Sequence, residues 1–392
     1  MKYIFVCSSF NIGGVATSFS YLVDGAIGGN DEVELHVVDQ ISEIKAYIPN
    51  RVKIVHVHGY YSDIYQKGTK NGTLFLLKKN GIWSAIKRLY VRFLEIFDIH
   101  KPLILNKDFF DSEQNNKCDI CVVLKENDPC LFYAINNVES RKRIAFFHTA
   151  GYLRNEYMPI YCSQMIDEII TVSTGNRDFL VEKMPLAASK IHVIHNIVPV
   201  DKIKILAKTT ESLFCDGELP ILFVGRICAE KGSNAIIETA ILLKDELPNI
   251  HWYLLGRFDH ELSYENFDKS LTENKIKERV TLLPALENPY PYIAQAWAIV
   301  NPSRIESYGM VIREAQILGK PVIATKTYGG IELIDDGKTG LLVDIDNSYQ
   351  LADTVKKLYN DVVCYNGIVT NLNESDFDES ELVREQFNAL LR

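Results

Sequence analysis

The chain has 392 residues, enough for two or three domains of ordinary size. Hydrophobic residues make up 47% of it and charged residues 24%, as in soluble globular proteins, and no run of 18 apolar residues is present that could span a bilayer. The formal net charge of −9 argues against a dedicated nucleic-acid-binding protein, because such proteins usually carry a basic excess.

Short apolar runs alternate with helix-length segments along the chain, in two successive series. Runs that are apolar on both faces and separated by helices indicate parallel strands buried between helices. The sequence therefore predicts an α/β protein with two Rossmann-like doubly wound domains, whose ligands lie beyond the carboxyl ends of the strands. The expected strands are 2–7, 33–38, 119–124, 143–148, 168–173 and 191–196 in the first series, and 220–225, 250–256, 279–284, 298–303, 321–325 and 340–344 in the second.

Residues 67–101 form an unusual segment within the first series, with eight basic and two acidic residues and apolar residues at helical spacing. A basic amphipathic helix of this kind can lie on an anionic membrane surface. The alternative is an ordinary helix whose apolar side packs on the sheet. The eight scattered cysteines, with a single CxxC at Cys118 and Cys121, indicate reduced thiols rather than a zinc site. We therefore expect a cytoplasmic protein, with peripheral contact at the cytoplasmic face of the inner membrane if the first interpretation holds.

The boundary between the two domains is predicted near residues 199–218, where proline and glycine interrupt the pattern. This gives an N-terminal acceptor-side domain over 1–200 and a C-terminal nucleotide-sugar domain over 201–375. The remaining segment, 376–392, has a capping-box-like start at Asp378 and reads as a short amphipathic helix. It either crosses back onto the first domain or is a frayed terminal helix.

Two motifs of the C-terminal domain carry residues suited to a nucleotide. VGRICAEKG follows an expected strand and places Arg226 and Lys231 where they can converge on an anion such as a diphosphate. ESYGMVIREA lies between two expected strands, so that its helix begins near Gly309 with free N–H groups and a partial positive charge that attract phosphate. Within it, Glu306 can accept hydrogen bonds from sugar hydroxyls, and Glu314 can accept two from a ribose diol.

A weaker signal is the Gly13-Gly14 pair after the first strand, where glycine lets the backbone approach a ligand closely. Together and in this order, the three motifs resemble the family 4 glycosyltransferases of GT-B architecture, in which two such domains face each other across a cleft. The resemblance runs nearly end to end and includes GGIELIDDGKTGLLVDID at 329–346. It implies a retaining hexosyltransferase that moves a sugar from a UDP- or GDP-sugar to a glycan or lipid-linked acceptor in bacterial surface polysaccharide synthesis.

The resemblance also implies a role for each site residue. Arg226 and Lys231 would hold the donor diphosphate, Glu314 the ribose and Glu306 the donor sugar. His148, at the end of an expected strand, matches the histidine of the first domain that touches the donor sugar. The implied catalytic set is Glu306, His148, Arg226 and Lys231, and the implied donor-binding set is Gly13, Gly14, Arg226, Lys231, Glu306, Tyr308, Gly309, Met310 and Glu314.

Two parts of the chain depart from this family. The loop at 282–290 lacks the usual glycine, so that the residues that read the base are not assigned, and the segment 60–115 carries no family motif. No cofactor and no metal are expected, because Arg226, Lys231 and the helix N-terminus offset the charge of a diphosphate. Two alternatives stay open, a sugar-nucleotide epimerase on the same architecture and a non-catalytic nucleotide-sugar-binding subunit of a transferase.

Overall fold

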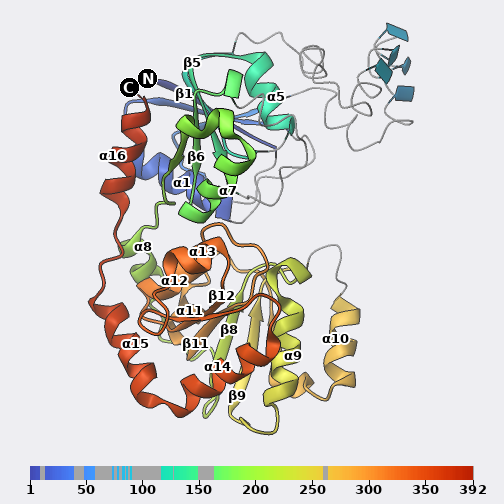
Figure 1. The fold of residues 1–392 in the computed structure, drawn as a ribbon, viewed down its shortest axis with the longest axis vertical. Helices are drawn as coiled ribbons and strands as arrows, with labels where there is room; N and C mark the ends of the chain where they lie inside the picture. The colour runs from blue at the N-terminus through green and yellow to red at the C-terminus, as the bar shows by residue number, and fades with distance from the viewer. Residues whose placement is uncertain are drawn as a thin grey trace. The chain divides into compact units, whose positions relative to one another are not determined.

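The computed structural model describes residues 1–8, 14–38, 48–57, several residues between 73 and 90, 116–126, 128–148, 163–258 and 264–391. Its contacts divide the chain into two compact units, each built from helices around a parallel sheet (Figure 1). The first unit comprises Met1–Val172, Asn176–His195 and Leu382–Arg392, and the second comprises Ser173–Gly175 and Asn196–Glu381. No helix in the described part of the chain is long and apolar enough to cross a bilayer.

The first unit contains a parallel sheet whose described strands run in the order β3-β2-β1-β4-β5-β6-β7. The order reverses direction between β1 and β4, as in doubly wound folds. Its described elements are β1 (Lys2–Cys7), α1 (Gly14–Ala26), β2 (Glu32–Val37), β3 (Val52–His56), β4 (Asn116–Val123), α5 (Asp128–Asn137), β5 (Val138–Phe147), β6 (Glu168–Thr171), α7 (Thr174–Lys183), β7 (Ile191–Val193) and most of α16 (Ser380–Leu391).

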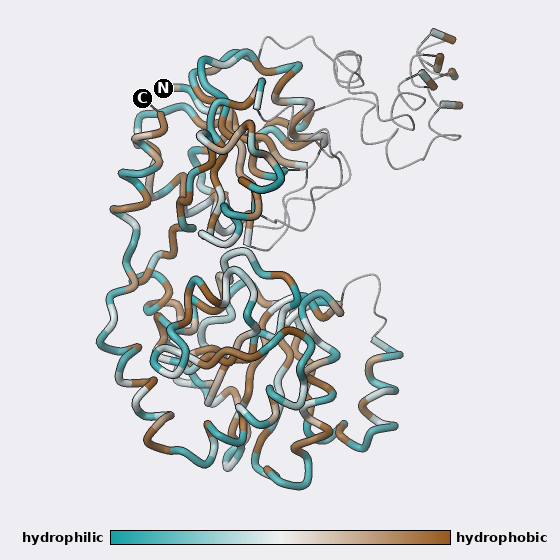
Figure 2. The backbone as a smooth tube through the Cα atoms, in the orientation of Figure 1, coloured by the Kyte–Doolittle hydropathy of each residue, from teal (hydrophilic) through white to brown (hydrophobic). Residues whose placement is uncertain are grey.

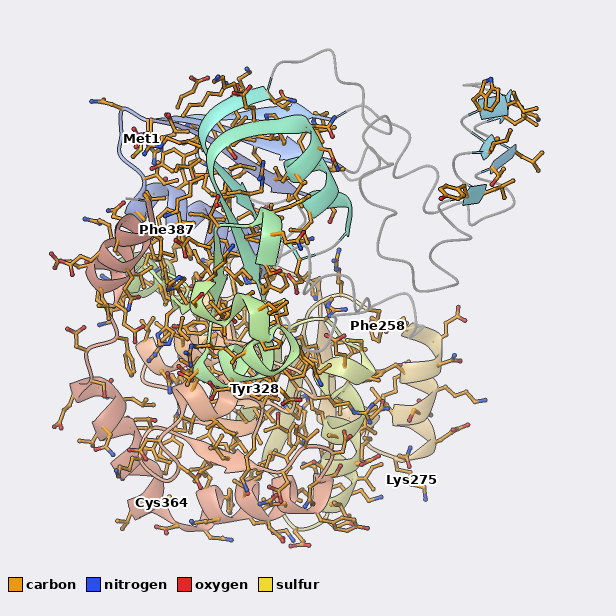
Figure 3. All side chains as sticks on the ribbon, turned by 45° about the horizontal axis from the view of Figure 1, so that its top comes forward. Met1, Phe258, Lys275, Tyr328, Cys364 and Phe387 are labelled. Atoms are coloured by element: carbon orange, nitrogen blue, oxygen red, sulfur yellow. The ribbon has the colours of Figure 1, made fainter. Side chains whose placement is uncertain are left out.

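The core of the first unit is built on its central strands. In β1 every residue from Tyr3 to Cys7 is buried, because helices cover both faces of a central strand. Figure 2 shows the matching concentration of hydrophobic residues along the strands. The final helix α16 adds Phe387, labelled in Figure 3, whose side chain is fully buried. This helix is therefore anchored by its apolar side, although it is separated from β1 by almost the whole sequence.

The second unit repeats the same strand order, β10-β9-β8-β11-β12-β13, again in parallel. Helix α9 packs against α14, and both contribute to the core on the sheet. The elements are α8 (Val200–Leu206), β8 (Leu219–Val224), α9 (Ser233–Leu243), β9 (Ile250–Leu255), α10 (Tyr264–Glu273), β10 (Val280–Leu283), α11 (Tyr290–Gln295), β11 (Ala298–Asn301), α12 (Met310–Ile317), β12 (Val322–Thr325), α13 (Tyr328–Leu333), β13 (Leu341–Val343), α14 (Ser348–Asn360) and α15 (Val362–Glu374).

The expected fold class, two Rossmann-like doubly wound α/β domains, is confirmed, and every strand expected from the sequence overlaps a strand of the structure. One described strand, β3, was not expected. It lies at the edge of the first sheet, where Lys53, Ile54 and His56 are exposed, so that its sequence lacks the continuous apolar run of a buried strand. Most of the segment 67–101 lies outside the described residues, and its predicted helix remains a prediction.

Candidate active site

The candidate site residues of the second unit lie on two loops, and on the helix α12 that follows one of them, at the point where the strand order reverses. Strands β8 and β11 are neighbours in the sheet, and the chain leaves them toward opposite sides. The loop after β8 carries Arg226 and Lys231, and the loop after β11 carries Glu306 and Gly309. In open parallel sheets, ligands bind beyond the carboxyl ends of the strands at such a point. The topology therefore brings the two sequence motifs to one edge of the sheet.

An ion pair and a backbone hydrogen bond join these two loops. The Nζ atom of Lys231 lies 2.8 Å from Oε2 of Glu306, and the two side chains are only 21% and 20% exposed. Beside this ion pair, the backbone N–H of Arg304 donates to the carbonyl oxygen of Glu230 over 2.8 Å. Lys231 and Glu306 are 75 residues apart in the sequence, and their ion pair holds the two motifs together.

The loop after β8 is also held on its other side. The backbone N–H of Ile227 donates to the carbonyl oxygen of Arg257 over 2.8 Å, in the loop after β9. Next to it Phe258, labelled in Figure 3, packs edge-on against Tyr264 and Phe267 of α10. The position of the β8 loop is therefore set by both neighbouring strands and by an aromatic cluster.

Arg226 contacts a carboxylate of its own loop. Its Nη2 atom lies 2.9 Å from Oε1 of Glu230, four residues later, and the arginine side chain is 39% exposed. The sequence predicted that Arg226 and Lys231 would converge on one anion, and the structure pairs each of them with a carboxylate. An anion that binds these two cations therefore competes with Glu230 and Glu306.

Gly309 immediately precedes helix α12, as its N-cap, and needs to be glycine. It has a φ of +92°, in the left-handed region, and a Cβ atom here would lie 2.8 Å from Cδ1 of Ile312. The preceding residue, Tyr308, is 3% exposed and therefore buried. The N–H of Gly329 donates to the carbonyl oxygen of Glu306 over 2.8 Å and fixes the start of this loop. The N–H groups from Tyr308 to Met310 remain proposed contacts for a ligand.

Glu314 lies inside α12 and is 6% exposed. Burial raises its pKa to about 7, although a hydrogen bond from Tyr290 acts in the opposite direction. The Oη atom of Tyr290 lies 3.3 Å from Oε1 of Glu314. Sequence reasoning missed Tyr290. The available signal was its place between Pro289 and Pro291, because proline in the first turn marks the start of a helix, here α11.

Of the candidate residues of the first unit, Gly13 lies outside the described residues and Gly14 is the first residue of α1. His148 follows β5, and its backbone N–H donates to Oε2 of Glu126 over 3.3 Å. Its ring stacks on Phe146 with 5.5 Å between ring centroids. Burial lowers the pKa of His148 to about 4, and the charge of Lys125 acts in the same direction. His148 is thus neutral near pH 7.

Two Asp-x-Asp sequences, at 344–346 and 376–378, resemble the motif that holds a metal ion in some glycosyltransferases, but their side chains are engaged in other contacts. Asp344 lies 2.7 Å from Nζ of Lys326, and Asp346 lies 2.6 Å from Nε of Arg304. Asp378 accepts from the N–H of Ser380 over 3.0 Å at the start of α16. Across the described ranges, no group of three or more His, Cys, Asp or Glu side chains is placed to hold a metal ion.

Comparison with known proteins identifies the second unit. A family model described as Glycosyl transferases group 1 matches residues 218–361. Residues 218–361 are therefore a glycosyltransferase domain of group 1. This glycosyltransferase domain contains Arg226, Lys231, Glu306 and Glu314, so that all the candidate residues of the second unit fall within it.

Individual relatives extend the comparison beyond the glycosyltransferase domain. The chain is 36% identical over 149 residues to D-inositol 3-phosphate glycosyltransferase of Pseudarthrobacter chlorophenolicus, and this match spans 37% of the chain and only 35% of that relative. It is 23% identical to the capsular polysaccharide biosynthesis glycosyltransferase CapM of Staphylococcus aureus, over 71% of the chain and 73% of CapM. The crystal structure of Anabaena Alr3699/HepE in complex with UDP-glucose matches with a TM-score of 0.69 at 17% identity, over 100% of this chain and 99% of that one. The GT-B fold class expected from the sequence, with two Rossmann-like domains, is thereby confirmed.

Proposed function

We propose that this chain is a retaining, metal-independent glycosyltransferase that moves a sugar from a UDP- or GDP-sugar to a glycan or lipid-linked acceptor of a bacterial surface polysaccharide. The observation that carries the proposal is the pairing of Lys231 with Glu306 over 2.8 Å, at the reversal of strand order and beside the start of α12. The group 1 domain match supports it, as do the similarity to CapM, a capsular polysaccharide biosynthesis glycosyltransferase, and the UDP-glucose bound to HepE.

In this function Arg226 and Lys231 bind the donor diphosphate in place of Glu230 and Glu306. The negative charge of the diphosphate grows as its bond to the sugar breaks, and the two cations stabilise it most at that point. The N–H groups at the start of α12 add their partial positive charge. Glu306, released from Lys231, accepts hydrogen bonds from the sugar hydroxyls.

The transfer step needs no side chain as a covalent nucleophile. The bond from the anomeric carbon to the diphosphate breaks while the acceptor oxygen forms its bond to the same face of an oxocarbenium-like sugar. The acceptor proton passes to the departing diphosphate, so that the anomeric configuration is retained. His148, which is neutral because its pKa is about 4, acts in this step as a hydrogen-bonding partner of the sugar rather than as a charge.

The test is turnover of a panel of UDP-, GDP- and ADP-sugars with a chelator present, followed as release of nucleoside diphosphate and as sugar products. We expect release from one donor and a product of retained anomeric configuration by NMR. Lys231→Ala should lose tenfold or more in turnover. Lys356→Ala should not, because Lys356 pairs with Glu246 over 2.7 Å and belongs to neither motif. A product of inverted configuration would overturn the retaining mechanism, and loss of activity with chelator would overturn metal independence. A new sugar nucleotide formed without release of nucleoside diphosphate would favour the epimerase.

The acceptor side of the proposal includes contact of residues 67–101 with an anionic membrane surface. Among the described residues of this segment, Ile82, Trp83 and Tyr90 are more than half exposed, at 61%, 79% and 52%. Such side chains insert at the level of the headgroups while basic residues attract anionic lipids. Co-sedimentation with anionic vesicles should recover the wild type and not a variant in which Lys78, Lys79, Lys87 and Arg88 are replaced by glutamine. Equal recovery of both would contradict the membrane contact.

A further inference from the structure

Tyr290 and Glu314 form a buried hydrogen-bonded pair within the second unit. They lie on neighbouring helices, α11 and α12, and each is only 6% exposed. The Oη atom of Tyr290 donates to Oε1 of Glu314 over 3.3 Å. Within the part of the chain that the structure describes, this is the one hydrogen bond to the Glu314 carboxyl. A buried carboxyl with a single partner has spare acceptor positions, since an ionised carboxylate can accept about four hydrogen bonds.

We infer that Tyr290 is a positioning residue for the donor nucleoside, whose hydroxyl orients the Glu314 carboxylate and keeps it an acceptor for the two hydroxyls of the ribose. This inference rests on the proposed function, in which Glu314 faces the ribose. Tyr290 itself need not touch the donor. It acts by holding one carboxylate oxygen, so that the remaining acceptor positions point to the diol in one orientation.

The protonation state of Glu314 is the reason that the hydroxyl matters. A ribose diol offers two donors. The ionised carboxylate accepts with both of its oxygens, whereas a protonated carboxyl uses one oxygen as a donor and accepts the diol less well. Burial raises the pKa of Glu314 to about 7, and the bond from Tyr290 is the influence that lowers it. Without the hydroxyl, a larger fraction of Glu314 would be protonated near pH 7.

The surroundings of Glu314 leave Tyr290 as the decisive neighbour. On α12 itself the charged neighbour Arg313 is engaged with Glu379, with 3.2 Å between Nη2 and Oε1. Strands β11 and β12, which pack against α12, carry no titratable side chain. The other titratable groups on helices packed against α12, none of which shifts the pKa of Glu314, are Asp201, Lys202, Lys204, Tyr292, Tyr328, Glu332, Cys364, Tyr365 and Glu374.

The experiment compares binding of UDP with binding of 2′,3′-dideoxyuridine diphosphate, by calorimetry on the full chain from about pH 6 to pH 8.5. The ratio of the two affinities isolates the diol, because phosphate titration near pH 6 affects both ligands alike. The wild type should prefer UDP, and this preference should fall as the pH drops below about 7. Tyr290→Phe keeps the ring, and should reduce the preference roughly tenfold at pH 7 and move its loss to higher pH.

Matched variants decide the outcome. Tyr253→Phe removes a similar bond elsewhere in the unit, the 2.7 Å contact of Tyr253 with Glu218, and should change neither the preference nor its pH dependence. Glu314→Gln should give a preference that no longer varies with pH. If Tyr290→Phe behaves like Tyr253→Phe, or if Glu314→Gln keeps the pH dependence, the inference is overturned while the proposed function stands. GDP and its 2′,3′-dideoxy analogue are tested in the same way. If the wild type binds neither UDP nor GDP, both the inference about Tyr290 and the proposed function are overturned.

Discussion

Replacing Glu306 by glutamine should raise the affinity for free UDP and lower the rate of donor turnover. In the structure the Glu306 carboxylate lies 2.8 Å from Nζ of Lys231, with both side chains about four-fifths buried at 20% and 21% exposure. In the proposed function the diphosphate binds the same ammonium group, so the two anions compete. Glutamine keeps the shape of the side chain and removes the charge that competes.

The size of the effect follows from the ion pair. Two unit charges about 4 Å apart attract by about 4 kcal/mol at the effective dielectric of a site near a protein surface, before the cost of desolvation. The net contribution of a hydrogen bond to a charged group is about 1.5–3 kcal/mol. Because glutamine still accepts a neutral hydrogen bond from Lys231, we expect a gain of about 1 kcal/mol, or about fivefold in UDP affinity. Turnover should fall tenfold or more, because the donor sugar loses an ionised acceptor.

Calorimetry with UDP and a release assay with the active donor measure the two quantities. Glu246→Gln is the control, because Glu246 pairs with Lys356 over 2.7 Å and belongs to neither motif. In a Lys231→Ala background, Glu306→Gln should no longer raise UDP affinity, since no ammonium group is left to release. A loss of UDP affinity that parallels the loss of turnover would refute the competition between Glu306 and the diphosphate.

Two further predictions concern stability. Gly232 has a φ of +77° and its added Cβ would lie 2.0 Å from the carbonyl oxygen of Pro302, whereas Gly217 has a φ of +82° with nothing within 4 Å. Gly217→Ala should therefore cost about 1 kcal/mol of unfolding free energy and Gly232→Ala at least about 3 kcal/mol, and equal losses in denaturant titrations would contradict the close approach of the two loops. Burial would raise the pKa of Glu34, but hydrogen bonds led by that from Lys53 lower it from 4.5 to about 2, so that the ionised carboxylate stabilises the folded unit. This stability is present above pH 4.5 and is lost as the pH falls toward 2, so Glu34→Gln should flatten the acid limb of a pH–stability curve; an unchanged limb would count against it.

The sequence predicts the strands of this protein well because burial on both faces leaves a direct mark. The run from Tyr3 to Cys7 is apolar throughout, and all of it is buried in β1. The edge strand β3 has no such mark, since Lys53 and His56 are exposed and interrupt the apolar pattern. The sequence therefore indicates the number of layers and the order of elements better than it indicates the edges of the sheets.

In the candidate site, too, features within one motif are predicted from the sequence, whereas contacts between distant residues are not. The glycine at 309 and the helix after it are predicted from the motif itself, and the structure has the left-handed φ of +92° at this residue. The pair of Arg226 and Glu230 is also local, because only four positions separate the two residues within the loop after β8. The contact of Tyr290 with Glu314 spans 24 residues and two helices, and depends on how α11 packs on α12. No spacing rule predicts such a contact.

The pairing of both site cations with carboxylates has a consequence for the catalytic cycle of the proposed function. An intact donor displaces Glu306 from Lys231 and offers it sugar hydroxyls in exchange, so the displaced carboxylate keeps hydrogen-bonding partners. Once the sugar has been transferred, the nucleoside diphosphate still occupies the cations and Glu306 has lost the sugar. A carboxylate in a partly buried position without a partner is costly. Its return to Lys231, 2.8 Å away in the structure, therefore opposes retention of the product and favours release after transfer.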